Sequence, residues 1–146
     1  MLTSSRWSEN WRAVAPSDAV PVDLPRSKRA WANVQERVRT LPVGTTVVLR
    51  DGALGSRWRC RRFAERAGVR LDRTYLAMPT VSAPAYLVQD SSASVAYFCR
   101  AILTVPPGLA VLAGPVEALL RSIRLLAPWR VVATLVPGRV AVGHRA

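Results

Sequence analysis

Cysteine and histidine are scarce in this sequence, and their scarcity excludes several kinds of site. The only cysteines, Cys60 and Cys99, form no CxxC pair and have no neighbouring histidine, so the spacing of a zinc site is absent. His144 is the only histidine and lies near the end of the chain, which argues against a Ser-His-Asp or Cys-His arrangement. The sequence therefore predicts no metal site and two buried thiols, which favours a reducing compartment.

Long apolar runs are also missing. Residues 1–10 include Arg6, Trp7 and Glu9 where an export signal would need an apolar segment, so no such signal is expected. The most apolar stretch, 103–120, is interrupted by prolines, and no transmembrane segment is predicted. On these grounds we expect a cytoplasmic protein.

Acidic residues are few as well, and the resulting excess of positive charge is the least ordinary feature of the chain. Its 146 residues include 21 Lys and Arg against 9 Asp and Glu, a net charge of +12, and Lys28 is the only lysine. A codon bias toward G and C explains arginine in place of lysine, but it does not remove acidic residues. The charge therefore predicts an anionic partner: nucleic acid, a phosphorylated metabolite, an anionic lipid or an acidic protein surface.

The chain does contain enough apolar material for one α/β domain. Apolar residues at helical spacing predict helices at 25–41, 56–67, 90–104 and 116–126. Short β-branched or alternating runs predict strands at 45–50, 69–78 and 85–89, and a terminal hairpin of 131–136 with 139–143. Residues 1–24 show no sustained period and are expected to form an irregular arm before a single domain at 25–146. The expected fold is a small three-layer Rossmann-like sheet with helices packed on it and a C-terminal hairpin.

Two features of this expected fold bear on contacts with other molecules. The helix predicted at 116–126 is amphipathic, which fits packing on the sheet better than binding at a membrane surface. A small sheet has exposed edge strands, which favours a homodimer formed by edge pairing or helix packing.

The strand-to-helix turn within RDGALGSRWRCRR, residues 50–62, is the strongest candidate for a binding site. A helix that Ser56 is expected to cap presents backbone N–H groups at the positive end of its dipole, which attracts anions. Arginines in the first turns oppose this dipole by a few tenths to about 1 kcal/mol each, so a bound anion would offset the repulsion. We therefore predict an anionic ligand at Gly52, Gly55, Ser56, Arg57, Arg59 and Arg61. The alternative is a solvated arginine face with Asp51 as its local counter-charge.

Catalytic and nucleotide motifs are sparse. Asp51 and Asp90 both follow predicted strands, and if those strands are parallel, both carboxylates lie at the carboxyl edge, where open α/β sheets bind ligands. Capping of a helix or turn is the alternative role for each. No P-loop is present, and Gly52-x-x-Gly55 covers only part of a dinucleotide fingerprint. Trp58 among arginines could stack on a base, but no nucleic-acid module is recognisable, so nucleic-acid binding is not favoured.

A resemblance to a known family lies between Val34 and Met78. A predicted helix leads into LPVGTTVV at 41–48, followed by RFAERAG at 62–68 and a strand that begins VRLDRTY at 69–75. These motifs resemble the second half of a class I S-adenosylmethionine-dependent methyltransferase, and the ending PGRVAVG is similar to the last strand of that fold. The resemblance covers roughly half of the chain.

The sequence departs from that family where the cofactor should bind. The glycine-rich loop E/DxGxGxG, and the acidic residue that would bind the ribose, should precede this region, and the loop occurs nowhere in the chain. No cofactor-binding residue is carried over, so S-adenosylmethionine is expected only if a partner supplies the missing half.

Three hypotheses for the function follow from the sequence. The leading one is a non-catalytic methyltransferase-like half-fold that binds an anionic ligand or a protein partner. The second is a small enzyme of a natural-product or cell-envelope pathway, with a polar site near Asp51 and Asp90. The third is a nucleic-acid binder without sequence preference, whose affinity would fall steeply with salt.

Overall fold

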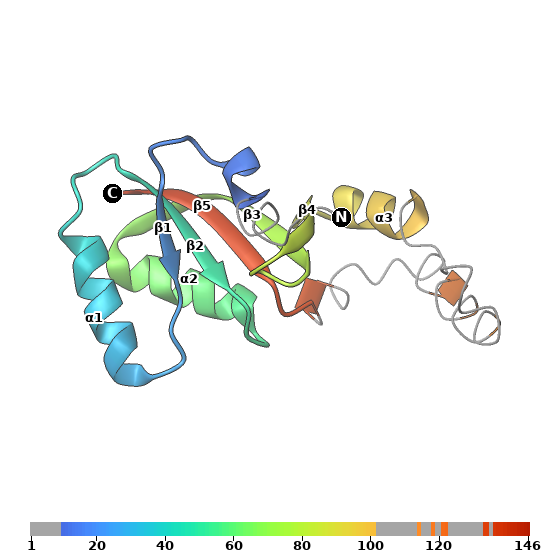
Figure 1. The fold of residues 1–146 in the computed structure, drawn as a ribbon, viewed down its shortest axis with the longest axis horizontal. Coiled ribbons are helices and arrows are strands. Elements are labelled where there is room, and N and C mark those ends of the chain that lie inside the picture. The colour runs from blue at the N-terminus through green and yellow to red at the C-terminus, as the bar shows by residue number, and fades with distance from the viewer. Residues whose placement is uncertain (1–9, 102–113, 115–117, 119–120, 123–132, 135) are drawn as a thin grey trace.

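A computed structural model describes residues 10–101, 114, 118, 121–122, 133–134 and 136–146 of the chain (Figure 1). Its elements are η2 (Asn10–Val14), β1 (Val20–Asp23), α1 (Lys28–Arg39), β2 (Thr46–Asp51), α2 (Ser56–Ala67), β3 (Val69–Pro79), β4 (Pro84–Gln89), α3 (Ser92–Ala101) and β5 (Arg139–Arg145). The α/β class predicted from the sequence is confirmed. No helix within the described ranges is long and apolar enough to cross a membrane.

The five strands form one mixed sheet in the order β1-β2-β5-β3-β4. β1 and β2 are parallel, and β5 is antiparallel to both of its neighbours, β2 and β3. β2 and β3 therefore run in the same direction, joined by α2, with the last strand of the chain inserted between them. In Figure 1 this inserted strand is the red arrow along the middle of the sheet.

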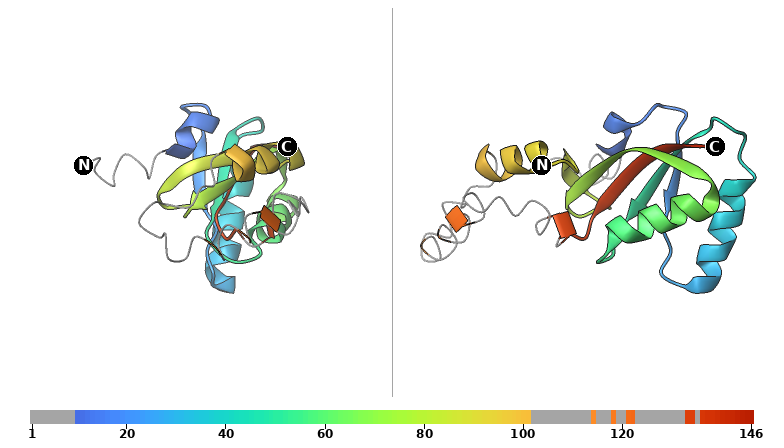
Figure 2. Two further views of the ribbon diagram at one scale, coloured as in Figure 1. Left: turned by 90° about the vertical axis from the view of Figure 1, so that its right-hand side faces the viewer. Right: turned by 180° about the vertical axis from the view of Figure 1, so that it is seen from behind.

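Successive side chains of β2 point to opposite faces of the sheet and therefore pack in two different layers. Val47 and Leu49 are buried against α1 and α2, where Phe63 forms the centre of the larger core. Val48 points to the opposite face and packs with Trp11 of η2. The views in Figure 2 show α1 and α2 together beside one side of the sheet, and the two helices contact each other there.

The helix ends follow capping rules, with one difference from expectation. Ser27 caps α1 by accepting a hydrogen bond from the Ala30 N–H at 3.2 Å, and Gly68 ends α2 with φ of 67°. The expected cap Ser56 is instead the first residue of α2, and Gly55 takes the cap position with φ of 75°. A left-handed cap favours glycine, and it turns the Ser56 side chain inward, where it is buried.

Two other expectations were wrong. Residues 20–23 are not irregular, because they form β1 and pair with β2 residue by residue. The terminal hairpin does not form, because β5 already has β2 on one side and β3 on the other. Residues 133–134 are helical, not extended. The helix predicted at 116–126 lies outside the described residues except at 118 and 121–122, as does the end of the helix predicted at 90–104.

Candidate functional site

The arginines predicted to form one anion site lie on two sides of α2. Helical spacing sends Arg57 and Arg61 toward β3, where both line a polar cavity. Arg59 points the other way, toward α1, where it lines a second cavity with Arg62 and Arg66. The predicted site residues are thus near one another in the chain but do not converge on a single point.

Arg59 and Asp51 form a partly buried ion pair at the turn between β2 and α2. Arg59 Nε lies 2.6 Å from Asp51 Oδ2, and its Nη2 donates to the Pro25 carbonyl at 2.8 Å. Asp51 Oδ1 accepts from the Ala53 N–H at 3.0 Å, which fixes the loop that contains Gly52. The Asp51 side chain is therefore fully engaged in ordering this turn.

Asp90 belongs to a second buried ion pair, centred on Arg139. The Arg139 guanidinium is 1% exposed and donates to Asp90 Oδ2, to the Ala133 carbonyl at 2.6 Å and to Ser56 Oγ at 3.4 Å. These contacts tie β5 to the first residue of α2 and to the end of β4. β4 is antiparallel to β3 and so runs opposite to β2. The parallel arrangement that would bring Asp51 and Asp90 to one carboxyl edge is therefore absent.

The cavity between α2 and β3 has a volume of about 340 Å³ and mixed charge. Its residues are Arg57, Cys60, Arg61, Leu71, Asp72, Arg73, Thr74, Gln89 and Asp90. Arg61 of this cavity is already paired with Glu65 at 2.9 Å. The carboxylates of Asp72 and Asp90, which line the cavity, offset part of the charge of its arginines. Arg57 Nε lies 3.8 Å from Asp90 Oδ2. This cavity therefore offers little net positive charge to a ligand.

Cys60 lines the same cavity but is not a ready nucleophile. Burial, and secondly the Asp51 carboxylate, raise the pKa of the Cys60 thiol to about 12, while Arg139 and Arg59 act in the opposite direction. Because the thiolate is the reactive form, the folded protein holds Cys60 in its unreactive state.

In a Cys99→Ser variant, we expect iodoacetamide to label Cys60 at pH 8 at least about a thousandfold more slowly in the native protein than in urea. With a pKa of about 12, about one thiol in 10⁴ is ionised at that pH. Raising the pH should accelerate native labelling, because the thiolate fraction then grows. Mass spectrometry over time measures both rates, and similar rates in the two states would contradict this assignment.

The second cavity is a groove of about 440 Å³ between α1 and α2. It is lined by Arg26, Ser27, Lys28, Trp31, Ala32, Gln35, Trp58, Arg59, Arg62 and Arg66. Five of these side chains are cationic. Among the described residues that line the groove, none is acidic. Arg59 is balanced by Asp51, but no ion pair to a described carboxylate is formed by Arg26, Lys28, Arg62 or Arg66. The groove therefore concentrates uncompensated positive charge.

Of the residues of this groove, the sequence predicts Arg59 as part of an anion site and offers Trp58 as a residue that could stack on a base. The available signal was the stripe Trp58, Arg62 and Arg66, which recurs every four residues along α2. The contribution of α1 could not be recognised without knowing that the two helices lie side by side.

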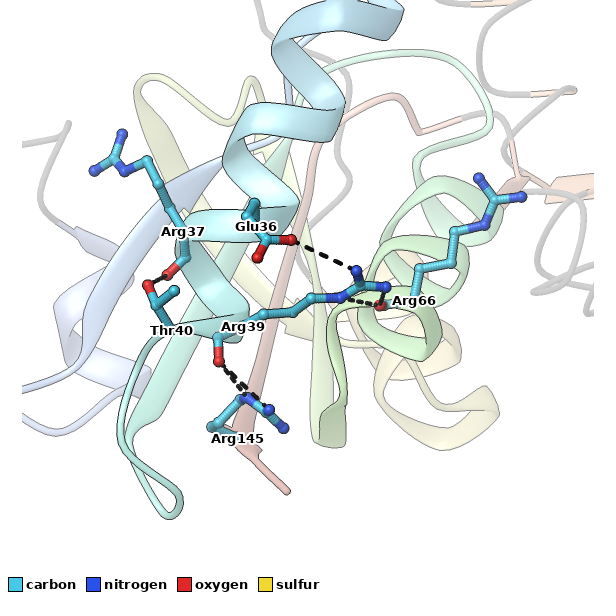
Figure 3. A network of polar contacts seen from close by, with 6 residues as sticks. All are labelled: Glu36, Arg37, Arg39, Thr40, Arg66 and Arg145. Carbon is cyan, nitrogen blue, oxygen red and sulfur yellow. Dashed lines mark hydrogen bonds and ion pairs between the residues drawn. The ribbon is translucent and has the colours of Figure 1, made fainter.

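Other arginines form structural hydrogen bonds at the C-terminal ends of α1 and α2 (Figure 3). Arg39 donates to the Arg66 carbonyl at 2.6 and 3.0 Å, and Arg145 Nη1 donates to the Gly68 carbonyl at 3.0 Å. Cations there complement the negative ends of the helix dipoles. In Figure 3 the Arg66 guanidinium points away from this network, which engages only its carbonyl. The charge of Arg66 is thus left for the groove.

Fold and site together define a small mixed α/β protein with a basic groove containing two tryptophans between its first two helices. No family model, curated protein or solved structure matches the chain.

Proposed function

We propose that this protein is a methyltransferase-like half-fold without a catalytic site of its own, and that it binds an anionic ligand in the groove between α1 and α2. The observation that carries the proposal is the set of five cationic side chains around one cavity with no acidic residue among those that line it. Such a concave surface of one charge sign attracts anions from solution and holds them where charges are least screened. The buried thiols Cys60 and Cys99 support a cytoplasmic location.

The strand order supports the resemblance to the carboxyl half of class I methyltransferases. The sheet of that family ends in a strand inserted antiparallel between two parallel strands that a helix connects. β5 occupies such a position between β2 and β3, and α1 and α2 each connect parallel strands. The relationship is proposed for this half alone.

The residues present do not fit S-adenosylmethionine, which supports a non-catalytic role. The loop between β1 and α1, residues 24–27, contains no glycine that would let a backbone approach a cofactor. In the loop after β2, a Cβ added to Gly52 would lie 3.1 Å from Val81 Cγ1, so protein already occupies that space. Asp51, which precedes this loop, is held by Arg59. We therefore derive no methyl-transfer step for this chain.

Titration with inorganic pyrophosphate at low ionic strength tests the proposed groove. The double variant Arg62→Glu/Arg66→Glu should bind pyrophosphate at least about tenfold more weakly than the natural protein, because two charge-assisted contacts become repulsive. Isothermal titration calorimetry measures the dissociation constants. Low salt is needed because surface charges are screened over about 10 Å at 0.1 M.

A matched control is Arg70→Glu/Arg73→Glu on β3. It changes the net charge equally at two exposed positions, and Arg73 lines the polar cavity on the other side of α2. Binding should survive in this control. Equal weakening in both variants would show a response to overall charge alone and would overturn the assignment to the groove.

A further inference from the structure

Resting on the proposed anion site, we infer that the ligand is a nucleoside phosphate, free or as a unit of a single strand. Its base would stack on Trp58, and its phosphates would contact the arginines of the groove. Arginine alone would recognise any anion, whereas this groove also contains two indole rings, Trp31 and Trp58. An aromatic ring beside a cluster of cations is the combination with which proteins bind nucleotides of any sequence.

Trp58 has the geometry of an open stacking platform. Its side chain is 61% exposed, although an indole is among the most costly groups to leave in water. The Arg62 guanidinium lies over its ring with a distance of 4.7 Å to the centroid, which holds the ring in place and positions a cation beside it. A base on the uncovered area of the indole would therefore have a phosphate contact within reach.

Trp31 forms the fixed wall of the groove. It packs edge-to-face on the buried Phe63, with 5.4 Å between ring centroids, and the Arg59 guanidinium lies 5.0 Å from its ring centroid. The adjacent Gln35 carries an amide that can both donate to and accept from the edge of a base. One rigid ring, one exposed ring and one amide together match the chemistry of a nucleobase.

The other anionic partners fit this groove less well. A lipid-binding surface combines cations with an extended apolar face built from Trp, Phe and Leu, and Trp31, Ala32 and Trp58 are the only apolar residues that line this groove. The volume of about 440 Å³ falls in the range of roughly 300–1,000 Å³ typical of small-ligand sites. An acidic protein surface would not need a concave site of this size.

Comparison of ADP with inorganic pyrophosphate separates the base from the phosphates. Calorimetric titration should show that the natural protein binds ADP about 5- to 150-fold more tightly, the range expected for stacking of one base. Trp58→Ala should remove this preference, so that ADP and pyrophosphate then bind with dissociation constants within about twofold of each other. Tyr97→Ala is the matched control, because Tyr97 is a 67% exposed aromatic residue on α3 that does not line the groove.

The outcomes distinguish this inference from the function on which it rests. Equal affinity for ADP and pyrophosphate would overturn the nucleoside assignment and leave the anion site intact, whereas absence of binding to both would overturn the anion site as well. A preference for ADP that survives in Trp58→Ala would show that the base does not stack on Trp58 and would also overturn the inference. Binding to phosphatidylglycerol vesicles without any preference for ADP would identify a lipid surface instead.

Two further titrations distinguish the sources of the nucleoside phosphate. If the natural ligand is a unit of a single-stranded nucleic acid, an oligothymidylate of eight nucleotides should bind more tightly than ADP, and its affinity should fall steeply as salt increases. If the natural ligand is a free nucleotide, ADP should bind at least as tightly as the oligonucleotide. Both results support a stacked base at Trp58, provided that Trp58→Ala weakens the tighter ligand.

Discussion

Replacing Arg139 by leucine is expected to lower the free energy of unfolding by about 3–5 kcal/mol, the range found when one member of a buried ion pair is removed. Arg139 is 1% exposed and its partner Asp90 is 6% exposed, so the variant would leave a carboxylate buried without its cation. The Ala133 carbonyl and the Ser56 hydroxyl would lose a donor at the same time. Chemical denaturation in urea, monitored by circular dichroism, measures the change.

The ion pair itself can be separated from the packing of Arg139 by a second variant. Asp90→Leu/Arg139→Leu removes both charges, and it should recover much of the lost stability because no uncompensated charge stays buried. Arg73→Leu on the exposed surface of β3 is the control and should change stability by less than about 0.5 kcal/mol. A loss below about 1 kcal/mol in Arg139→Leu would contradict the structural role assigned to this pair.

The buried position of Arg139 could not be read from the sequence. The strand that it opens was recognised, since RVAV follows the turn residues Pro137-Gly138. Arginine at the start of a strand is ordinarily exposed, however, and only the insertion of β5 between β2 and β3 brings its side chain under the start of α2. Local patterns identify strands, whereas the order of strands is decided by contacts between distant parts of the chain.

The same distinction explains the outcome for β1 and for the hairpin. VPVD at 20–23 is too short and too proline-rich to show a period, and it becomes a strand because β2 offers it a parallel edge. The hairpin was a reasonable local interpretation of a Pro-Gly turn, but it assumed that β5 pairs with the segment preceding it. The long-range partners of β5 exclude that pairing.

Only part of the candidate site can be predicted from the sequence. The clustering of arginine along α2 was visible, and helical geometry alone assigns Arg57 and Arg61 to one side and Arg59, Arg62 and Arg66 to the other. Which side keeps its charge depends on neighbours that only the fold supplies. Asp72 of β3 and Asp90 after β4 bring carboxylates to the first side. Lys28 and Trp31 of α1, with Arg26 just before this helix, bring two further cations and a tryptophan to the second.

Gly143→Ala is expected to destabilise the sheet by about 3 kcal/mol, the upper part of the range for overpacking. Gly143 pairs with Leu71 of β3, beside the register shift at Asp72. A Cβ at this position would lie 2.2 Å from the Arg70 carbonyl oxygen and 2.9 Å from the Leu71 Cα. These are backbone atoms of the neighbouring strand β3, so the clash is removed only if β3 and β5 move apart. Their separation would break hydrogen bonds that join β3 and β4 to the rest of the sheet.

Gly114→Ala provides the matched control for this substitution. Gly114 is helical, and a Cβ added there meets nothing within 4 Å. The same chemical change should therefore alter the free energy of unfolding by less than about 1 kcal/mol, because the restriction of the unfolded chain by alanine offsets the crowding between its Cβ and the following Pro115. Urea denaturation of both variants measures the contrast. Equal stability of the two variants would mean that β3 and β5 can separate at little cost, which contradicts a β5 held firmly at the centre of the sheet.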